Sequence, residues 1–215
     1  MANLYEKYRP TSVKGIVGQC PAKKKLRIML RTGWGGKAFW ISGPSGSGKT
    51  TLAYIIARKG ADDFFITEFD SGHELTTDAL NEVESAMHLT ASGKGGRAFI
   101  VNEAHGLRAW MVRRLLGLLE RLPSHVVFIF TTTAEGQLHL FEENVDAGPL
   151  LSRCITLETD NKMLTNPFAR RAKQIARKEH LDGRPLKDYI DLVKRCGGNM
   201  RMIIQEIECG AMLRR

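Results

Sequence analysis

The stretch Gly43-Pro44-Ser45-Gly46-Ser47-Gly48-Lys49-Thr50-Thr51 decides the fold. It fits the pattern GxxxxGK[ST], in which glycines let the backbone wrap phosphate groups closely and the N–H groups point at them. Residues 38–42 before it form a short apolar run typical of a buried strand, and helical spacing of apolar residues follows over residues 50–59. This is the strand–loop–helix context that the motif requires, so the sequence predicts a P-loop that binds ATP.

Each part of the predicted P-loop has a chemical role. Lys49 is expected to neutralise the charge of the β- and γ-phosphates, and the Thr50 hydroxyl to bind Mg²⁺. The remaining contacts with the nucleotide are expected from the loop residues around them, namely Pro44, Ser45, Gly46, Ser47, Gly48 and Thr51.

Apolar runs around this motif alternate between strand-like and helix-like spacing, which is typical of a parallel sheet covered by helices. Strands are expected over residues 38–42, 64–69, 98–102, 126–131 and 154–157, and helices over 50–59, 77–89 and 107–122. Loops are expected over residues 93–96 and 134–149. Beyond residue 159 the pattern predicts three helices, over 167–180, 186–195 and 199–213, with Asn199 as an N-cap. We therefore expect an α/β domain over residues 1–158 and a small helical domain over 159–215.

Composition limits the class of protein. The chain has 215 residues, 43% of them hydrophobic, and no apolar run approaches the length of a membrane span. Its four cysteines lie far apart and form no CxxC pair, which argues against a zinc module and is typical of reduced thiols. We expect a cytoplasmic protein whose only metal is the Mg²⁺ that accompanies the nucleotide.

Charge points to an anionic partner. The net charge is +9, and no acidic residue occurs between Glu6 and Asp62, where twelve lysines and arginines fall. A second basic cluster is Arg170, Arg171, Lys173, Arg177 and Lys178. Either cluster alone could be a solvated helix face. Together, in an ATP-binding protein, they favour DNA or RNA bound through phosphates, and no interleaved aromatic residues indicate base stacking.

A P-loop ATPase needs a second strand that ends in acidic residues, one to hold Mg²⁺ and one to polarise water. Residues 98–103, Ala-Phe-Ile-Val-Asn-Glu, match that strand with one departure. Asn102 stands where a metal-binding aspartate is expected, so weaker Mg²⁺ binding and slow hydrolysis are predicted. Glu103 keeps the position of the general base. An acid at a strand end can also be a simple helix cap, but the P-loop about fifty residues upstream favours the catalytic interpretation.

Several further motifs occur in a specific order. Leu4-Tyr5-Glu6-Lys7-Tyr8-Arg9-Pro10 and Ile16-Val17-Gly18-Gln19 open the chain, and Asn102-Glu103-Ala104-His105 follows the P-loop. Ser152-Arg153-Cys154 and Gly197-Gly198-Asn199-Met200-Arg201 come later. This ordered series, which spans nearly the whole chain, resembles clamp-loader subunits of the AAA+ ATPases, such as the bacterial gamma/tau subunit and replication factor C. The resemblance implies a five-stranded parallel P-loop sheet flanked by helices, followed by a three-helix lid.

The resemblance also implies roles for individual residues. The adenine pocket would be lined by Tyr8, Arg9, Pro10, Val17 and Gly18. Thr133 would orient the attacking water, and Arg153 would be an arginine finger that reaches the ATP of a neighbouring subunit. Arg201 would contact the γ-phosphate from the lid. For Arg153 and Arg201 the alternative is an ordinary surface ion pair.

The implied function is loading a sliding clamp onto DNA, as part of a homo- or hetero-oligomer. Two alternatives remain open: a stand-alone AAA+ switch such as a helicase loader or mobile-element regulator, and a weakly hydrolysing structural subunit. Clamp loaders continue into a helical collar after the lid, whereas the printed sequence ends there, as a minimal member or a piece of a longer subunit would. Glu103, Arg153 and Arg201 disfavour the structural subunit, because a pure scaffold needs none of them.

Overall fold

The computed structural model describes residues 3–143, 146–161 and 163–213. Five parallel strands form one sheet in the order β2-β3-β4-β1-β5. They are β1 (Lys37–Ser42), β2 (Ala61–Phe69), β3 (Gly96–Val101), β4 (Val126–Thr132) and β5 (Cys154–Glu158). All five expected strands are therefore present, with ends that differ from the predicted ones by a few residues at most. Because the strands are parallel, all their carboxyl ends lie at one edge, where the P-loop begins after β1.

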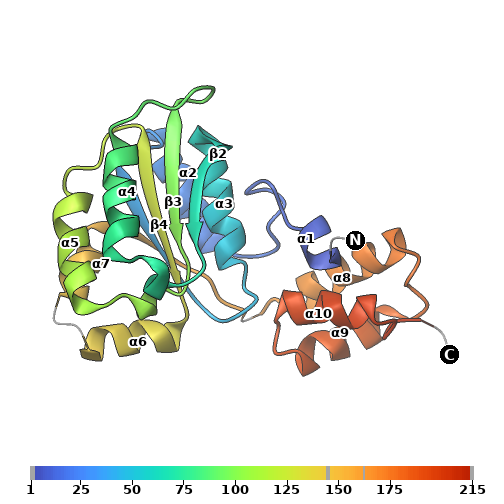
Figure 1. Cartoon of the computed structure of the whole chain (residues 1–215). Coiled ribbons are helices and arrows are strands. Elements are labelled where there is room, and N and C mark those ends of the chain that lie inside the picture. The colour runs from blue at the N-terminus through green and yellow to red at the C-terminus, as the bar shows by residue number, and fades with distance from the viewer. Residues whose placement is uncertain (1–2, 144–145, 162, 214–215) are drawn as a thin grey trace.

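Helices cover both faces of the sheet (Figure 1). On one face lie α2 (Cys20–Arg31) and α3 (Lys49–Gly60), whose Leu26, Leu52 and Ile56 pack against Phe39 and Ile41 of β1. On the other face lie α4 (Thr77–Met87) and α5 (Ala109–Leu119). Alternate strand residues point to the two faces, so both sides of the central strands are apolar.

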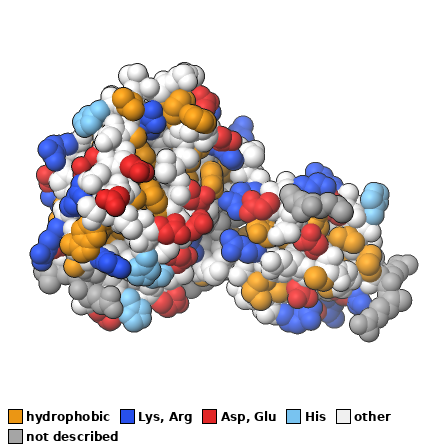
Figure 2. All heavy atoms as spheres, in the orientation of Figure 1, with side chains coloured by type: hydrophobic (Ala, Val, Ile, Leu, Met, Phe, Trp, Pro, Cys, Tyr) orange, Lys and Arg blue, Asp and Glu red, His pale blue; other side chains and the backbone are white. Residues whose placement is uncertain are grey.

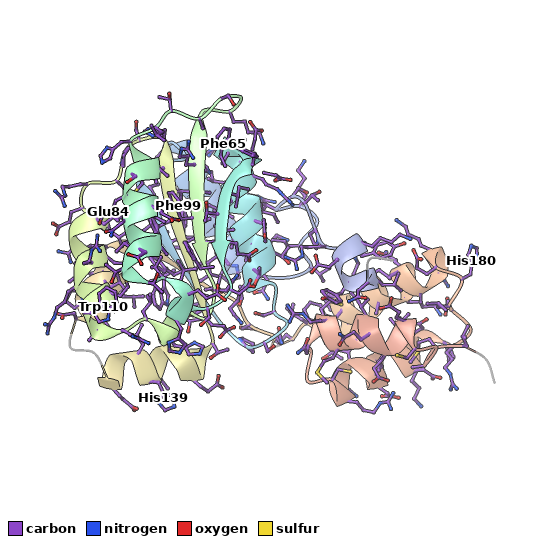
Figure 3. The ribbon with its side chains drawn as sticks, viewed as in Figure 1. Phe65, Glu84, Phe99, Trp110, His139 and His180 are labelled. Carbon is purple, nitrogen blue, oxygen red and sulfur yellow. The ribbon has the colours of Figure 1, made fainter. Side chains whose placement is uncertain are left out.

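The apolar core between the sheet and the helices α4 and α5, called the second core below, shows this alternation in its aromatic residues. Trp40, Phe99, Phe128 and Phe130 lie together between the sheet and α4 and α5, with the Phe99 and Phe128 ring centroids 5.0 Å apart. Figure 3 shows Phe99 directed into the interior, beside the helix that carries Glu84. Burying these rings on one face of the strands holds the carboxyl ends of β1, β3 and β4 in a fixed arrangement.

A smaller group of helices follows β5 along the chain. It contains α8 (Thr165–Lys178), α9 (Leu186–Arg195) and α10 (Met200–Glu208), packed around Phe168, Tyr189 and Ile203. The predicted N-cap is confirmed, since the Asn199 Oδ1 accepts hydrogen bonds from the backbone N–H groups of Arg201 and Met202. The last helix ends at Glu208, earlier than the predicted limit of residue 213.

The short α1 (Leu4–Lys7) lies beside this helical group rather than on the sheet (Figure 1). Leu4 packs against Ile175 of α8 and Ile204 of α10, and Lys7 forms an ion pair with Glu179 at 2.7 Å. The Tyr8 hydroxyl also donates a hydrogen bond to Glu179. Hydrogen bonding to Lys7 holds the pKa of Glu179 below its usual value, and Tyr8 acts in the same direction. The helix α1 near the start of the described residues and the helix α10 near their end therefore pack together.

The prediction of a loop over residues 134–149 is wrong. Helices α6 (Ala134–Glu143) and α7 (Ala147–Ser152) occupy most of this stretch. Gly136, Gly148 and Pro149 gave it the composition of a loop, but Leu140, Ala147 and Leu150 are buried against the second core. The Trp40 indole also donates a hydrogen bond to the Gln137 side chain at 3.1 Å. Tertiary burial here outweighs weak local helix propensity.

The helix α2 is an addition to the predicted elements. Its sequence, CPAKKKLRIMLR, is dominated by basic side chains, and only Ala22 and Leu26 are buried. None of the helices in the described part of the chain has the length and apolarity that crossing a lipid bilayer requires.

Candidate functional site

The P-loop runs from the end of β1 to the start of α3, and its glycines adopt backbone angles that other residues avoid. Gly43, Gly46 and Gly48 have φ values of 146°, 70° and 97°. Gly46 also faces the helical group at close range, since a Cβ atom there would lie 2.0 Å from the Asn199 Oδ1. The loop thus touches the N-cap of α10 directly.

Buried side chains outside the motif hold the loop in shape. The Ser47 hydroxyl lies 2.7 Å from the Thr159 hydroxyl, and Thr159 also donates to the Ser42 carbonyl at 3.1 Å. Gln19, only 6% exposed, donates to the carbonyls of Ser47 and Asp160 at 3.3 and 2.6 Å. Sequence reasoning assigned no role to Gln19 or Thr159. Gln19 does lie within the opening motif, which was the available signal for it.

Lys49 is a buried cation at the centre of the loop. It is 8% exposed, and its Nζ donates hydrogen bonds to the carbonyls of Gly43 and Pro44 at 2.9 and 3.0 Å. Burial lowers the pKa of Lys49, and the positive charge of Arg201 acts in the same direction, while Glu103 and Glu135 oppose it. A cation that burial destabilises gains most from a bound anion.

The first turn of α3 adds to this preference for an anion. Its N-cap is Gly48, which has no side chain to accept a hydrogen bond from the helix N–H groups. The N–H groups in the first turn of a helix have no partner within the helix, and together with the helix dipole they favour a negative charge beside Lys49. The site therefore fits the phosphates of a nucleotide.

One cavity joins the P-loop to the helical group. It is lined on one side by Ser45, Gly46, Ser47, Gly48, Lys49, Thr50 and Thr51, and on the other by Tyr8, Arg9, Pro10, Val17 and Arg201. Glu103 also lies on its wall. The structure thus brings together the predicted phosphate-binding and adenine-binding residues, although they are spread over most of the chain.

Two residues predicted to contact the nucleotide are not in the lining of this cavity. Pro44 contributes its carbonyl, which accepts hydrogen bonds from Ser47 and Lys49. Gly18, with φ of 67°, lies where a Cβ atom would be 2.4 Å from the Leu164 side chain. The positive φ and the closeness of Leu164 both favour a glycine at this position, which is next to Val17 of the cavity lining.

The apolar half of the cavity was missed by sequence reasoning. Phe168, Ile175 and Ile204 of the helical group and Ile16 line it, together with Tyr5 and Met200. Arg171, which the sequence placed only in a basic cluster, lines it as well. Such a lining suits a flat heterocycle, because apolar side chains with a few polar groups are typical of ligand pockets. The available signal was the strong apolar periodicity of α8 and α10.

At the carboxyl ends of the strands, Asn102 is almost completely buried, with 9% of its surface exposed. The Thr131 hydroxyl donates to the Asn102 Oδ1 at 2.9 Å, and the Thr50 hydroxyl donates to the same atom at 3.4 Å. A hydroxyl and an amide oxygen are hard oxygen donors of the kind that Mg²⁺ binds. Asn102 and Thr50, the two predicted metal ligands, are thus adjacent.

Glu103 follows Asn102 in a left-handed backbone conformation, with φ of 45°. Such a conformation is uncommon for a residue other than glycine and turns the side chain away from the strand direction. Its carboxylate lies 3.4 Å from the His105 Nδ1, and that nitrogen lies 3.2 Å from the Thr132 hydroxyl. The side chain of Glu103 is 48% exposed, so it reaches the cavity with access to solvent.

Thr133 and Arg153 are not among the residues that line the cavity. The Thr133 hydroxyl accepts a hydrogen bond from the Gly136 N–H at 3.0 Å and so caps the first turn of α6. Arg153 lies at the C-terminal end of α7, where its Nε donates to the Glu120 Oε1 at 3.0 Å. Its Nη1 donates to the Pro149 carbonyl at 3.0 Å. Arg153 is thus directed towards α5 rather than towards this chain's own P-loop.

Sequence comparison identifies relatives. No family model matches the chain. The DNA polymerase III subunit gamma/tau of Mycobacterium tuberculosis is 31% identical over 156 residues, which is 60% of this chain and 27% of that protein. The replication factor C large subunit of Methanococcus maripaludis is 27% identical over 216 residues, which is 97% of this chain and 42% of that protein. These curated relatives are clamp-loader AAA+ ATPases. The chain spans about a quarter to two fifths of their length.

Structural comparison gives the same fold. A variant of RuvB from Thermotoga maritima superimposes with a TM-score of 0.72 at 23% identity, covering 94% of this chain and 64% of that one. The fold is that of the AAA+ ATPases. The predicted architecture, a five-stranded parallel sheet flanked by helices and followed by a helical lid, is therefore confirmed, and α8, α9 and α10 are called the lid from here on.

Proposed function

We propose that this chain is an ATP-hydrolysing AAA+ subunit of the clamp-loader type, which acts on DNA within an oligomer. The observation that carries the proposal is the cavity in which Lys49, Glu103 and Arg201 meet between the sheet and the lid. A phosphate-binding loop, an acid and a second cation around one space are what phosphoryl transfer to water requires. The sequence relatives support the clamp-loader type.

In the proposed mechanism the backbone of the P-loop and Lys49 would bind the phosphates. Thr50 and Asn102 would hold Mg²⁺, whose charge would screen that of the phosphates. Glu103 accepts a proton from the attacking water, and His105 fixes the direction of the Glu103 carboxylate. Thr133, which follows β4 and lies outside the cavity lining, would orient that water with its hydroxyl proton while it accepts from the Gly136 N–H. The apolar side chains of the lid, together with Tyr8 and Val17, bind the adenine ring.

Two contacts would make the position of the lid depend on the bound nucleotide. Arg201 lines the cavity beside Lys49, and the Met200 N–H donates a hydrogen bond to the Gly46 carbonyl at 3.4 Å. Phosphates bound in the loop would therefore alter the contacts at the start of α10. We assign residues 1–158 to the nucleotide-binding domain and 159–215 to the lid domain, and α1 of the first domain packs against the second through Leu4.

The proposed partners are DNA, other AAA+ subunits and a sliding clamp, and the proposed location is the cytoplasm. Basic side chains are spread over the face of the molecule seen in Figure 2 rather than gathered in one stripe. In α8, Lys173 and Arg177 both pair with Asp182, at 2.9 Å each, and Arg171 faces the nucleotide cavity. The region before Asp62 therefore supplies more of the proposed DNA contacts than α8 does.

A nucleotide-switch function without rapid turnover remains the second candidate, because Asn102 brings no negative charge to the metal. Two measurements on the same protein separate the candidates. The first is the solution mass with ATP and primed DNA, and the second is the rate of phosphate release. An ATP-dependent oligomer with DNA-stimulated phosphate release supports the clamp-loader type, and ATP binding without stimulated release supports the switch.

The P-loop assignment itself is tested by Lys49→Ala. Removing the lysine should cost on the order of 2 kcal/mol or more of binding free energy for a fluorescent ATP analogue, because the phosphates lose a charge-assisted contact. Glu103→Gln serves as the control, since it should bind the analogue normally and fail to release phosphate. Unchanged affinity of Lys49→Ala for the ATP analogue would refute the P-loop assignment.

A further inference from the structure

Glu68 is an acid beside the proposed metal site that no sequence motif singled out. It lies near the carboxyl end of β2, whose neighbour in the sheet is β3, and the Asn102 N–H donates to the Phe69 carbonyl at 2.9 Å. This pairing brings the two side chains together. The Asn102 Nδ2 donates a hydrogen bond to the Glu68 Oε1 at 2.6 Å.

This contact fixes which way the Asn102 amide faces. A carboxylate can only accept hydrogen bonds, so the NH₂ group of Asn102 must point at Glu68. The amide oxygen is then directed to the opposite side, where the hydroxyls of Thr131 and Thr50 donate to it at 2.9 and 3.4 Å. With Glu68 in place, the atom of Asn102 that faces Thr50 is an oxygen, which can accept from or bind a metal, and not a nitrogen.

Glu68 is itself held in position. The Tyr54 hydroxyl donates to its second carboxylate oxygen, so both oxygens accept hydrogen bonds from buried or half-buried groups. Within the described part of the chain, Glu68 forms no ion pair with a lysine or arginine within 4.0 Å. The nearby Arg58 pairs with Asp63 and the nearby Arg9 pairs with Glu6. The charge of Glu68 is therefore not neutralised by a direct partner.

We propose that Glu68 supplies the carboxylate charge that Asn102 lacks, acting as a positioning residue that directs the Asn102 amide oxygen at the Mg²⁺ bound with the nucleotide. The inference rests on the proposed nucleotide-binding function. The negative charge would then belong to Glu68 and act through the amide group of Asn102, instead of belonging to residue 102 itself. At the effective dielectric of a protein site, a charge at that separation still attracts a divalent cation.

The other acids of this region are less suited to that task. Glu68 shares the wall of one cavity with Thr50, Asn102, Asp70 and Glu103. Glu103 is turned towards His105 and is half exposed. Asp70 lies at the strand end with its side chain in solvent. Among the acids that the structure describes, only Glu68 makes a hydrogen bond to Asn102, and so only its charge is coupled to the orientation of the amide.

The test is a Mg²⁺ titration of the binding of a fluorescent, non-hydrolysable ATP analogue. Glu68→Gln keeps a side chain of the same shape that can accept from Asn102, and removes the charge. It should raise the Mg²⁺ concentration for half-maximal binding by about threefold or more, with binding in EDTA unchanged. When Asn102→Asp is also present, Glu68→Gln should shift the midpoint by less than about twofold, because position 102 then carries the charge.

Tyr54→Phe is the matched control, because it removes the other hydrogen bond to Glu68 and leaves the carboxylate, and it should shift the midpoint by less than about twofold. A midpoint that Glu68→Gln leaves unchanged overturns the proposal, and so does an equal shift with and without Asn102→Asp. Failure of the proposed function looks different. In that case the protein binds no analogue, or Lys49→Ala binds it normally, whatever residue is at position 68.

Discussion

Arg153 and Glu120 form an ion pair on the surface away from the P-loop of their own chain. Two nitrogens of the Arg153 guanidinium donate to the Glu120 Oε1, and a third donates to the Pro149 carbonyl. The arginine proposed to act on a neighbour's ATP is thus held within its own subunit by α5 and α7. Its side chain is 32% exposed, so it is open to a partner on the outer side.

Activity should therefore be shared between subunits. Arg153→Ala is expected to bind ATP normally and to lose hydrolysis by roughly a thousandfold if turnover depends fully on a trans arginine. Mixing it with Lys49→Ala protein should restore part of the phosphate release, because some pairs combine an intact Arg153 with an intact P-loop. The recovered rate should grow with protein concentration and with added DNA. No recovery at any mixing ratio would exclude the shared site.

The pair with Glu120 should compete with the trans contact. Glu120→Gln is expected to raise phosphate release by up to about fivefold at a fixed protein concentration, since an exposed ion pair contributes about 1 kcal/mol or less. Asp146→Asn is the matched control, because it breaks the Arg113–Asp146 ion pair on the same side of the molecule without touching Arg153. If both variants change the rate equally, the effect is one of surface charge and not of a released Arg153.

The contact between the P-loop and the lid should depend on Gly46. Gly46→Ala places a methyl group 2.0 Å from the Asn199 Oδ1 and also strains a backbone with φ of 70°. We expect ATP-analogue affinity to fall at least about tenfold as the start of α10 is displaced, and thermal stability to fall as well.

Gly197→Ala separates the two effects of that substitution. Gly197 has φ of 58°, and apart from its own chain neighbours no described heavy atom lies within 4 Å of the position that a Cβ would take, so the strain is similar and the clash is absent. This variant should lose stability by about 1 kcal/mol and keep its affinity for the analogue. Equal losses of affinity in the two variants would show that strain, and not the lid contact, sets nucleotide binding.

DNA binding should be electrostatic and insensitive to sequence. Raising the salt concentration from about 50 to 200 mM should weaken binding steeply, with several ions released, in fluorescence anisotropy titrations with duplexes of different sequence. Charge removal at Lys24 and Arg27 of α2 should reduce the slope, whereas Arg177→Gln should leave it unchanged, because Arg177 is paired with Asp182. A flat salt dependence, or a strong preference for one duplex, would contradict the prediction.

Several features of this protein follow from the sequence alone. Five apolar runs, the GxxxxGK[ST] pattern and the ordered motifs predicted the parallel sheet, the P-loop and the lid, because strand burial and phosphate binding impose short local patterns. The same reasoning predicted that Asn102 stands at a metal-binding position where an aspartate is expected. The helices α6 and α7 were not predictable locally, because the burial of Leu140 and Leu150 stabilises them against unfavourable glycine and proline.

Only the tertiary structure decided what surrounds those motifs. Phe168, Ile175 and Ile204 became part of the nucleotide cavity because the lid folds back onto residues that precede it by more than a hundred positions. Glu68 came to lie beside Asn102 through the neighbouring positions of β2 and β3 in the sheet, and Arg153 came to lie beside Glu120 through the packing of α7 on α5. The spacing of residues along a chain does not predict such contacts, because strand order and helix packing are set by burial of the whole core.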